Sequence, residues 1–326
     1  MHLLDRPRRN RKHLAIRSLV RETRLLNTNL IQPLFVLEGE KCREVESMPG
    51  IKRLSVGSVI QECGDLVQLG FSAVALFPSI ALERKDAQGS YGLDPSNVLF
   101  TAVRAVKEAY PGLMVIADIA LDPYTDHGHD GVINNGKVDN DASTKVLCDL
   151  AVAAAGTGVD IVAPSDMMDG RVRAIRIALD KAGFQEVSIL SYAVKYASAY
   201  YSPFREAVGS NGPAYFLDKQ SYQMDPANVR EAVREVLLDV QEGADMLMVK
   251  PAGAYLDIIH VVREQTLLPL GAYQTSGEYA QIHAAAQRGW LDYKQTRDEA
   301  LLAIRRAGAD FILTYFAREI VEASLQ

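Results

Sequence analysis

Short apolar runs alternate with amphipathic stretches along most of this 326-residue chain, and this alternation constrains the fold more than any other feature. There are eight runs, each apolar throughout instead of at every second residue, which is typical of strands buried on both faces of a parallel sheet. The runs are residues 31–37, 72–77, 114–118, 159–163, 187–192, 246–250, 270–273 and 311–315. Helical patterns lie between them, for example at 96–110, 144–156, 170–182, 226–242, 255–265, 278–288 and 293–307.

Eight strand–helix units in a chain of this length predict a (β/α)8 TIM barrel. A doubly wound open sheet is the competing architecture, but it would normally carry a glycine-rich nucleotide-binding turn after its first strand. Here the first run continues into Glu38-Gly39-Glu40, which is no such turn. We therefore expect a single barrel domain over residues 30–326.

The composition is that of an ordinary soluble globular protein, with 48% hydrophobic and 23% charged residues. A net charge of −6 argues against a nucleic-acid-binding protein, and no apolar run approaches the roughly 18 residues that a membrane span needs. Cys42, Cys63 and Cys148 lack the paired spacing of a disulfide framework or a cysteine metal site. A cytoplasmic protein is the simplest interpretation.

Residues 1–29 form an arginine-rich segment with too few apolar residues to build a core of their own. We expect an N-terminal arm that packs on another subunit of a homo-oligomer. Nucleic-acid contact and a transit peptide are the alternatives. Asp5, Glu22 and the negative charge of the rest of the chain argue against nucleic-acid contact.

In a barrel the chemistry lies at the carboxyl ends of the strands, and several runs end there on polar or reactive residues. The third run ends at Asp118, the fourth is followed by Ser165, and the fifth ends near Tyr192 and is followed by Lys195. The sixth run ends on Lys250. Two lysines are therefore expected at one mouth of the barrel.

Lys250 is a candidate Schiff-base nucleophile because burial at a strand end lowers the pKa of an amine and leaves it neutral often enough to attack a carbonyl. Its stem could instead pack on the strand end while the ammonium reaches water, and Lys195 by itself also fits a surface lysine. One strand-end lysine near Asp118 would suit a class I aldolase. Two suggest either two carbonyl substrates or one amine that acidifies the other.

Several long segments resemble the porphobilinogen synthase, or 5-aminolevulinate dehydratase, family. MLMVKPAGAYLDI, around Lys250, is similar to that family's Schiff-base segment, and SYAVKYASAYYSPFREA, around Lys195, is similar to the segment with its second active-site lysine. Further matches are KDAQGSYGLDP, APSDMMDGRV, KQSYQMDPAN and AYQTSGEY. They occur in the right order through the whole barrel.

The resemblance implies a lyase that condenses two molecules of 5-aminolevulinate to porphobilinogen with loss of two waters, without an organic cofactor. It implies that Lys250 and Lys195 each form a Schiff base, with Lys250 on the propionate side of the product and Lys195 on the acetate side. It assigns Arg205 and Lys219 to the acetate-side carboxylate, and Ser276 and Tyr315 to the other carboxylate. We also place six residues in the catalytic or substrate-binding set, namely Asp118, Asp122, Asp130, Ser165, Tyr192 and Gln223.

The long connection at about 195–225 matches the family's active-site lid, which would protect imine intermediates from water. The resemblance also implies a homo-oligomer, with an octamer built from dimers as the expected form. The rival interpretations are an aldolase-type enzyme that needs only Lys250, and a barrel scaffold whose basic arm binds RNA or a partner.

The metal-binding residues differ from those of part of the family. Zinc-using members carry three cysteines where this chain has Ala120, Asp122 and Asp130, so no zinc site is expected. His127 and His129 could join these carboxylates in a metal cluster, but histidines in a glycine-flanked loop are more often hydrogen-bonded structure. Glu235 matches the glutamate that holds a non-catalytic, activating magnesium in some members, a coordination that keeps most of the metal's waters.

Overall fold

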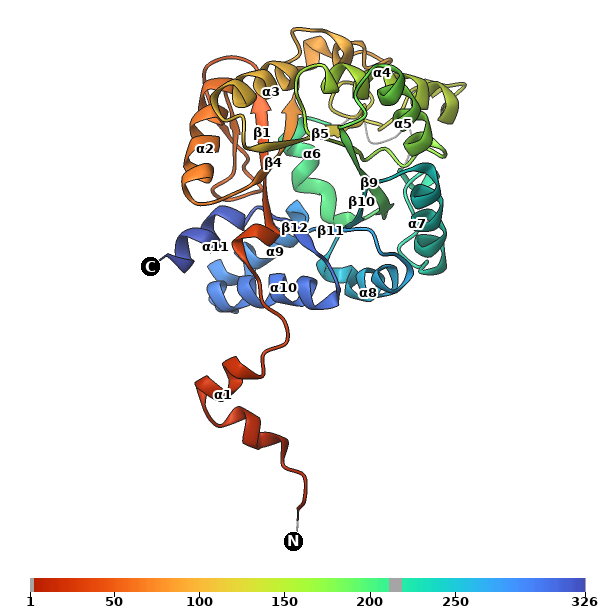
Figure 1. Ribbon diagram of the computed structural model, residues 1–326. Helices are drawn as coiled ribbons and strands as arrows, with labels where there is room; N and C mark the ends of the chain where they lie inside the picture. The colour runs from red at the N-terminus through yellow and green to blue at the C-terminus, as the bar shows by residue number, and fades with distance from the viewer. Residues whose placement is uncertain (1–2, 211–218, 326) are drawn as a thin grey trace.

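The computed structural model describes residues 3–210 and 219–325. Within these residues eight parallel strands form a closed barrel, because the last strand pairs with the first (Figure 1). In order around the barrel they are β1 (Leu30–Leu37), β4 (Ala73–Ser79), β5 (Met114–Ile119), β8 (Ile161–Pro164), β9 (Ser188–Lys195), β10 (Met246–Lys250), β11 (Leu270–Tyr273) and β12 (Phe311–Leu313). The predicted (β/α)8 barrel is confirmed, and all eight apolar runs form its strands.

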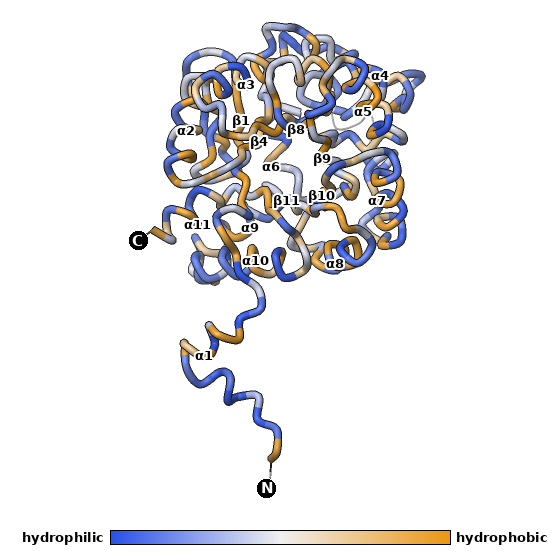
Figure 2. Tube along the Cα trace, viewed as in Figure 1, coloured by the Kyte–Doolittle hydropathy of each residue, from blue (hydrophilic) through white to orange (hydrophobic). Residues whose placement is uncertain are grey.

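Helices surround the barrel, except α6, which lies near its centre in Figure 1. The helices that follow the strands are α2 (Val56–Gln68), α3 (Val98–Ala109), α4 (Asn140–Ala155), α5 (Arg171–Lys181), α6 (Ser202–Val208), α7 (Arg230–Glu242), α8 (Leu256–Gln265), α9 (Ser276–Gln287), α10 (Tyr293–Ala307) and α11 (Ala317–Ser324). Figure 2 shows hydrophobic and hydrophilic residues alternating along the outer helices, as expected when one face packs on the barrel.

Local sequence signals set the ends of these helices. Thr275 caps α9 in a capping box with Glu278, and Asp292 caps α10 by accepting a hydrogen bond from the backbone of Gln295. At the other end of a helix, Gly243 follows α7 with φ +101°, a left-handed conformation that glycine adopts without strain.

Short elements extend this frame. Strands β2 (Arg43–Glu44) and β3 (Lys52–Leu54) form an antiparallel pair, and β3 lies parallel to the end of β1. Strands β6 (Ile133–Asn134) and β7 (Lys137–Val138) form a separate hairpin in the loop after β5. In the described part of the chain, six short 3-10 helices join these elements, namely η2 (Asn27–Asn29), η3 (Leu82–Arg84), η4 (Ser90–Leu93), η5 (Ala199–Tyr201), η6 (Lys219–Ser221) and η7 (Gly253–Tyr255).

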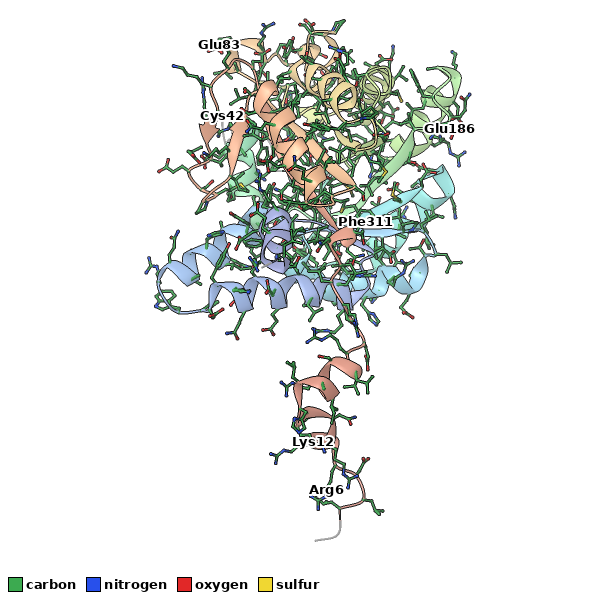
Figure 3. All side chains as sticks on the ribbon, turned by 60° about the vertical axis from the view of Figure 1, so that its left-hand side comes forward. Arg6, Lys12, Cys42, Glu83, Glu186 and Phe311 are labelled. Carbon is green, nitrogen blue, oxygen red and sulfur yellow. The ribbon has the colours of Figure 1, made fainter. Side chains whose placement is uncertain are left out.

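The N-terminal segment extends away from the barrel (Figure 1) and contains η1 (Pro7–Arg11) and α1 (Leu14–Leu19). Arg6 and Lys12 project from it far from the barrel (Figure 3). The exposed fractions of Leu14 and Leu19 are 67% and 82%, so the arm also presents apolar side chains to solvent. The first barrel strand begins at Leu30, next to the predicted arm boundary at residue 29.

The connection predicted to act as a lid, 195–225, begins inside strand β9 and includes η5, α6 and η6. Its residues 211–218 lie outside the described residues. Among the residues that are described, no helix is long and apolar enough to cross a membrane.

Candidate active site

Lys250 and Lys195 are the last residues of neighbouring strands, and their Cα atoms are partners in the β9–β10 register. The register shifts between Leu247 and Val249, where β9 contains one residue more than β10. This irregularity brings Lys195 opposite Lys250. The fifth apolar run was predicted to end at Tyr192, but the strand continues to Lys195, so Lys195 belongs to the barrel wall and the surface alternative for it is wrong.

Aromatic rings surround the Lys250 ammonium. Its Nζ lies 4.6 Å from the ring centre of Tyr273, 4.8 Å from that of Phe204, 5.2 Å from that of Tyr201 and 5.3 Å from that of Tyr192. Ring faces stabilise a cation by about 1–2 kcal/mol. Loss of water costs more, so burial, with repulsion from Lys195, lowers the pKa of Lys250 to about 7.

Lys195 has polar neighbours instead. Its Nζ donates to Asp130 Oδ2 at 3.0 Å and to the backbone carbonyl of Ser165. Burial opposes its charge, but Asp130, Asp122 and Asp118 outweigh burial and raise the pKa of Lys195. This lysine is therefore an ammonium ion when the site is empty, whereas Lys250 is neutral in a large fraction of molecules near pH 7.

Asp130 is the centre of a polar group that also holds Lys219 and Gln223. Its oxygens accept from Lys219 Nζ at 2.7 Å and from Gln223 Nε2 at 3.1 Å, and Lys219 Nζ also lies 3.7 Å from Asp122. Burial alone would raise the pKa of Asp130, but Lys195 and Lys219 hold it well below its usual range. Asp130 is thus a fixed negative charge between two cations.

Asp118, at the end of β5, is buried and its Oδ1 has no hydrogen-bond partner among the described residues. Burial and the nearby Asp122 raise the pKa of Asp118 to about 7, while Lys250 opposes the rise. A carboxyl group with this pKa exchanges a proton near neutral pH, which suits acid–base work. An unpartnered buried oxygen close to both lysines supports a role in proton transfer.

The residues predicted to bind the second carboxylate occupy the same mouth. Tyr315 is buried, and its hydroxyl lies 2.9 Å from that of Tyr273, whose ring faces Lys250. Ser276 Oγ accepts from the backbone N–H of Phe204 at 2.9 Å. Arg205, the next residue along α6, makes no ion pair with any described residue, so its guanidinium is available for an anion.

A family model described as delta-aminolevulinic acid dehydratase matches residues 4–323. The chain is 52% identical to the Chlamydia pneumoniae protein of that name, over 98% of this chain and 96% of the relative. It is 50% identical to the Bradyrhizobium diazoefficiens protein, over 99% and 91%. The chain belongs to the delta-aminolevulinic acid dehydratase family.

A solved structure of a family member supports this assignment at the level of the backbone. The Toxoplasma gondii delta-aminolevulinic acid dehydratase, crystallised with its reaction product porphobilinogen, is 47% identical and superposes with a TM-score of 0.96. The match covers 98% of this chain and 92% of the other. The delta-aminolevulinic acid dehydratase fold thus extends over essentially the whole chain, arm included.

In this delta-aminolevulinic acid dehydratase family member the loop histidines make structural contacts. His129 Nδ1 lies 3.1 Å from the Tyr222 hydroxyl and His127 Nε2 lies 3.3 Å from the Ala87 carbonyl. No group of three or more His, Cys, Asp or Glu residues that could hold a metal ion occurs in the described part of the chain. Burial, together with Lys219, lowers the pKa of His129 to about 4.

Glu235, the predicted magnesium ligand, lies on α7, the helix between β9 and β10. It lines a cavity of about 580 Å³ together with Asp169, Glu231 and Met168. Burial raises the pKa of Glu235, and Arg171 opposes the rise. A half-buried carboxylate beside a cavity with room for several waters fits a hard cation that keeps most of its waters.

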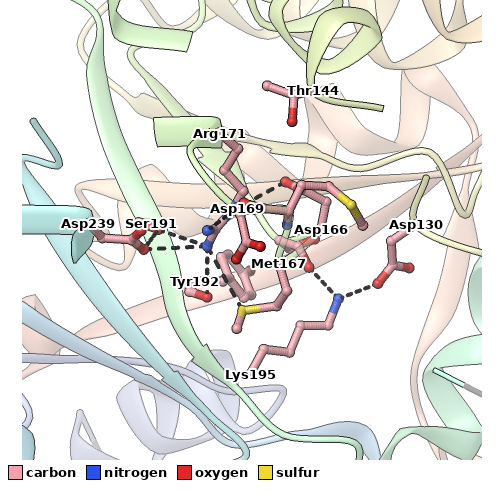
Figure 4. Close-up of polar contacts among 12 residues, drawn as sticks. Asp130, Thr144, Asp166, Met167, Asp169, Arg171, Ser191, Tyr192, Lys195 and Asp239 are labelled. Atoms are coloured by element: carbon pink, nitrogen blue, oxygen red, sulfur yellow. Dashed lines mark hydrogen bonds and ion pairs between the residues drawn. The ribbon is translucent and has the colours of Figure 1, made fainter. Parts of the chain in front are cut away.

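Sequence reasoning missed the residues that support the lysines. Tyr201, Phe204 and Tyr273 surround Lys250, and the tyrosine-rich composition after Lys195 could have indicated only the first of them. Arg171 was also missed. It is buried with ion pairs to Asp166 at 3.5 Å and Asp239 at 3.4 Å, behind the carbonyl that binds Lys195 (Figure 4).

Proposed function

We propose that this chain is a porphobilinogen synthase that joins two molecules of 5-aminolevulinate through Schiff bases on Lys250 and Lys195. One C–C bond and one C–N bond form between the substrates, and two waters leave. The observation that supports the proposal is the pair of buried lysines at adjacent strand ends, one with a lowered and one with a raised pKa. Each lysine can take the ketone of one substrate.

Lys250 is the amine ready to react first, because its pKa of about 7 leaves much of it neutral in the empty site. Lys195 must lose a proton before it attacks. The Asp130 carboxylate, 3.0 Å away, stays an anion and orients the ammonium, so another base must take this proton. Asp118, with a pKa of about 7, is placed to take or return protons as imines form and as the product ring loses its final hydrogen.

The substrate carboxylates need cationic or hydroxyl groups on either side of the lysines. We assign Arg205 and Lys219 to one carboxylate, and Ser276 and Tyr315 to the other. Gln223, next to Asp130, completes the side of the site around Lys195, and Tyr192 belongs to the rings around Lys250. Lys219 donates to Asp130, so substrate binding would exchange one carboxylate partner for another.

We further propose that magnesium bound through Glu235 activates the enzyme without entering the reaction, and that no zinc or organic cofactor is needed. The arm, with its arginines and exposed leucines, would pack on a second copy of the chain in a homo-oligomer, an octamer built from dimers. The cytoplasmic location stays a prediction.

Borohydride trapping tests the proposed function. The protein is incubated with 5-aminolevulinate, reduced, digested and analysed by mass spectrometry, alongside Lys250→Met, Lys195→Met and the surface control Lys181→Met. We expect adducts on Lys250 and Lys195, and turnover lowered by about 10³-fold or more in either active-site variant but unchanged in the control. Absence of adducts from the wild-type protein would refute the Schiff-base mechanism.

A further inference from the structure

Helix α6 carries much of the wall around Lys250. Phe204 lies within it, and Tyr201 is the residue before it, with its hydroxyl donating to the Lys250 carbonyl at 3.1 Å. Their ring centres lie 4.8 and 5.2 Å from Lys250 Nζ. Arg205, assigned above to a substrate carboxylate, lies on the same helix. The position of this short helix therefore affects both the exclusion of water from the Lys250 amine and the binding of substrate.

Seven residues are too few for a helix to be stable without outside contacts. The amino end of α6 is held from α9, where Ser276 Oγ accepts from the Phe204 N–H at 2.9 Å and contacts the Tyr200 carbonyl at 3.4 Å. Gly277 permits this approach, because a Cβ at that position would lie 2.7 Å from backbone atoms of Tyr200.

Two cations from distant parts of the chain hold the carboxyl end of α6. Arg53, on β3, donates from Nε to the Ala207 carbonyl at 2.7 Å and from Nη2 to the Glu206 carbonyl at 2.6 Å. Lys85 Nζ donates to the carbonyl of Gly209, the C-cap residue, at 2.5 Å. The last carbonyls of a helix lack partners within it and carry partial negative charge, so cations stabilise them.

Glu206, on α6, is in turn hydrogen-bonded to the segment that carries Arg53. Its carboxylate accepts from the backbone N–H of Glu46 at 3.0 Å and from that of Ser47 at 3.3 Å, both in the loop between β2 and β3. β3 itself pairs with β1, where Arg53 is the partner of Phe35, and the Phe35 ring lies 5.7 Å from that of Phe204. The β2–β3 pair and α6 thus form one hydrogen-bonded unit next to the active site.

We propose that Arg53, assisted by Lys85, is a positioning residue that fixes α6 over Lys250 and sets the placement of Phe204 and Arg205. Arg53 touches neither lysine, so it acts through the helix. Its planar guanidinium can donate to two successive helix carbonyls at once, in a geometry that a lysine ammonium cannot reproduce. The kinetic consequence of this inference rests on the proposed function, but its structural consequence does not.

The kinetic test compares Arg53→Met with Arg53→Lys and Lys85→Met. In Arg53→Met we expect KM for 5-aminolevulinate to rise by about 5–10-fold, because Arg205 loses its fixed place, with a smaller fall in kcat. We also expect the pH of half-maximal borohydride trapping at Lys250 to rise by about half a unit or more as water reaches the amine. Arg53→Lys should lie between Arg53→Met and the wild type.

Lys52→Met is the matched control, because Lys52 precedes Arg53 on β3 but pairs outward with Glu44 at 3.1 Å, with half of its side chain exposed. It should leave KM and the trapping profile unchanged. Thermal unfolding and size-exclusion elution identify any variant that fails to fold. If Arg53→Met does not fold, the same measurements are made on Arg53→Lys. Wild-type KM and trapping pH in folded Arg53→Met would overturn the proposal.

Amide hydrogen exchange separates this inference from the proposed function. In Arg53→Met the amides of residues 204–209 should exchange at least about 10-fold faster than in Lys52→Met, with the barrel strands unchanged. Unchanged exchange in α6 overturns the positioning role, even if the protein makes porphobilinogen. If the wild-type protein forms no adduct but α6 loosens as expected, the proposed function fails and the positioning role stands.

Discussion

The two active-site lysines occupy equivalent places at the ends of β9 and β10, yet their surroundings are opposite. Lys250 faces four aromatic rings, whereas Lys195 donates to Asp130 and to the Ser165 carbonyl. The strands determine that the two amines are neighbours. Asp130, in the loop after β5, and the rings that come from η5, α6, β9 and β11 determine which amine carries a proton. The strand ends therefore supply proximity, and the side chains around them supply the difference in reactivity.

The size of the competing effects explains why nearby carboxylates can reverse the protonation state of a buried lysine. Two unit charges 3 Å apart attract by on the order of 5 kcal/mol at the effective dielectric of a protein site. Desolvation of an ammonium costs several kcal/mol, which is similar. At Lys195 the further negative charge of Asp122 and Asp118 tips the balance toward the charged form, and the Ser165 carbonyl accepts a hydrogen bond from the ammonium. Lys250 has no carboxylate in hydrogen-bonding contact among the described residues and so becomes the weaker base.

The largest expected contrast is in stability, where the two Lys→Met substitutions should have opposite signs. The folded pKa of Lys250, about 7, lies below its ordinary value of 10.5, so the folded state binds fewer protons between these pH values and Lys250 costs stability as the pH falls. Lys250→Met should stabilise by a few kcal/mol near and below pH 7 and by little above pH 10.

Lys195→Met should instead destabilise by about 3–5 kcal/mol at neutral pH, because it leaves Asp130 with a single cation. The pKa of Lys195 is raised in the fold, so its stabilising effect is complete below pH 10.5 and is lost as the pH rises through the folded value. Chemical denaturation from pH 6 to 10 checks both substitutions. Equal effects of the same sign would contradict the opposite protonation states of the two lysines.

Removing the anion should make Lys195 resemble Lys250. In Asp130→Asn the pKa of Lys195 should fall, so that borohydride adducts on Lys195 form at lower pH than in the wild type. Turnover should drop by about 10–100-fold, because Lys219 and Gln223 lose the same partner. Asp126→Asn, an exposed carboxylate in the same loop, is the control and should leave the trapping profile unchanged.

The sequence predicted the barrel and both lysines because these depend on local signals, namely continuous apolar runs and the residues that end them. Asp118 was recognised in the same way. The rings around Lys250 were not, since Tyr201, Phe204 and Tyr273 come from three elements that meet only in the folded barrel. Arg171 was missed for a similar reason, because an arginine near the start of a helix normally indicates a solvated face.

Opening the aromatic wall should bring Lys250 closer to an ordinary lysine. Phe204→Ala admits water beside the amine, and we expect the pKa of Lys250 to rise by about one unit from its value of about 7, leaving about 10-fold less neutral amine below that pH. The pH dependence of trapping at Lys250 measures the shift. Phe184→Ala, which removes a partly buried ring packed on the core elsewhere, is the matched control. A downward or absent shift would show that the rings are not what keeps water from the amine.

The smallest expected effect concerns the proposed magnesium site. Loss of this site should affect Lys195 more than Lys250. Glu235 interacts electrostatically with Arg171, which pairs with Asp166, the residue after Ser165 (Figure 4). Glu235→Gln should abolish stimulation by magnesium, an effect of about 2–5-fold, and change the trapping rate at Lys195 more than at Lys250. Glu231→Gln, one helical turn away on the same cavity, is the comparison variant. Equal changes at both lysines would show that the metal acts on the barrel as a whole and not through Arg171 and Asp166.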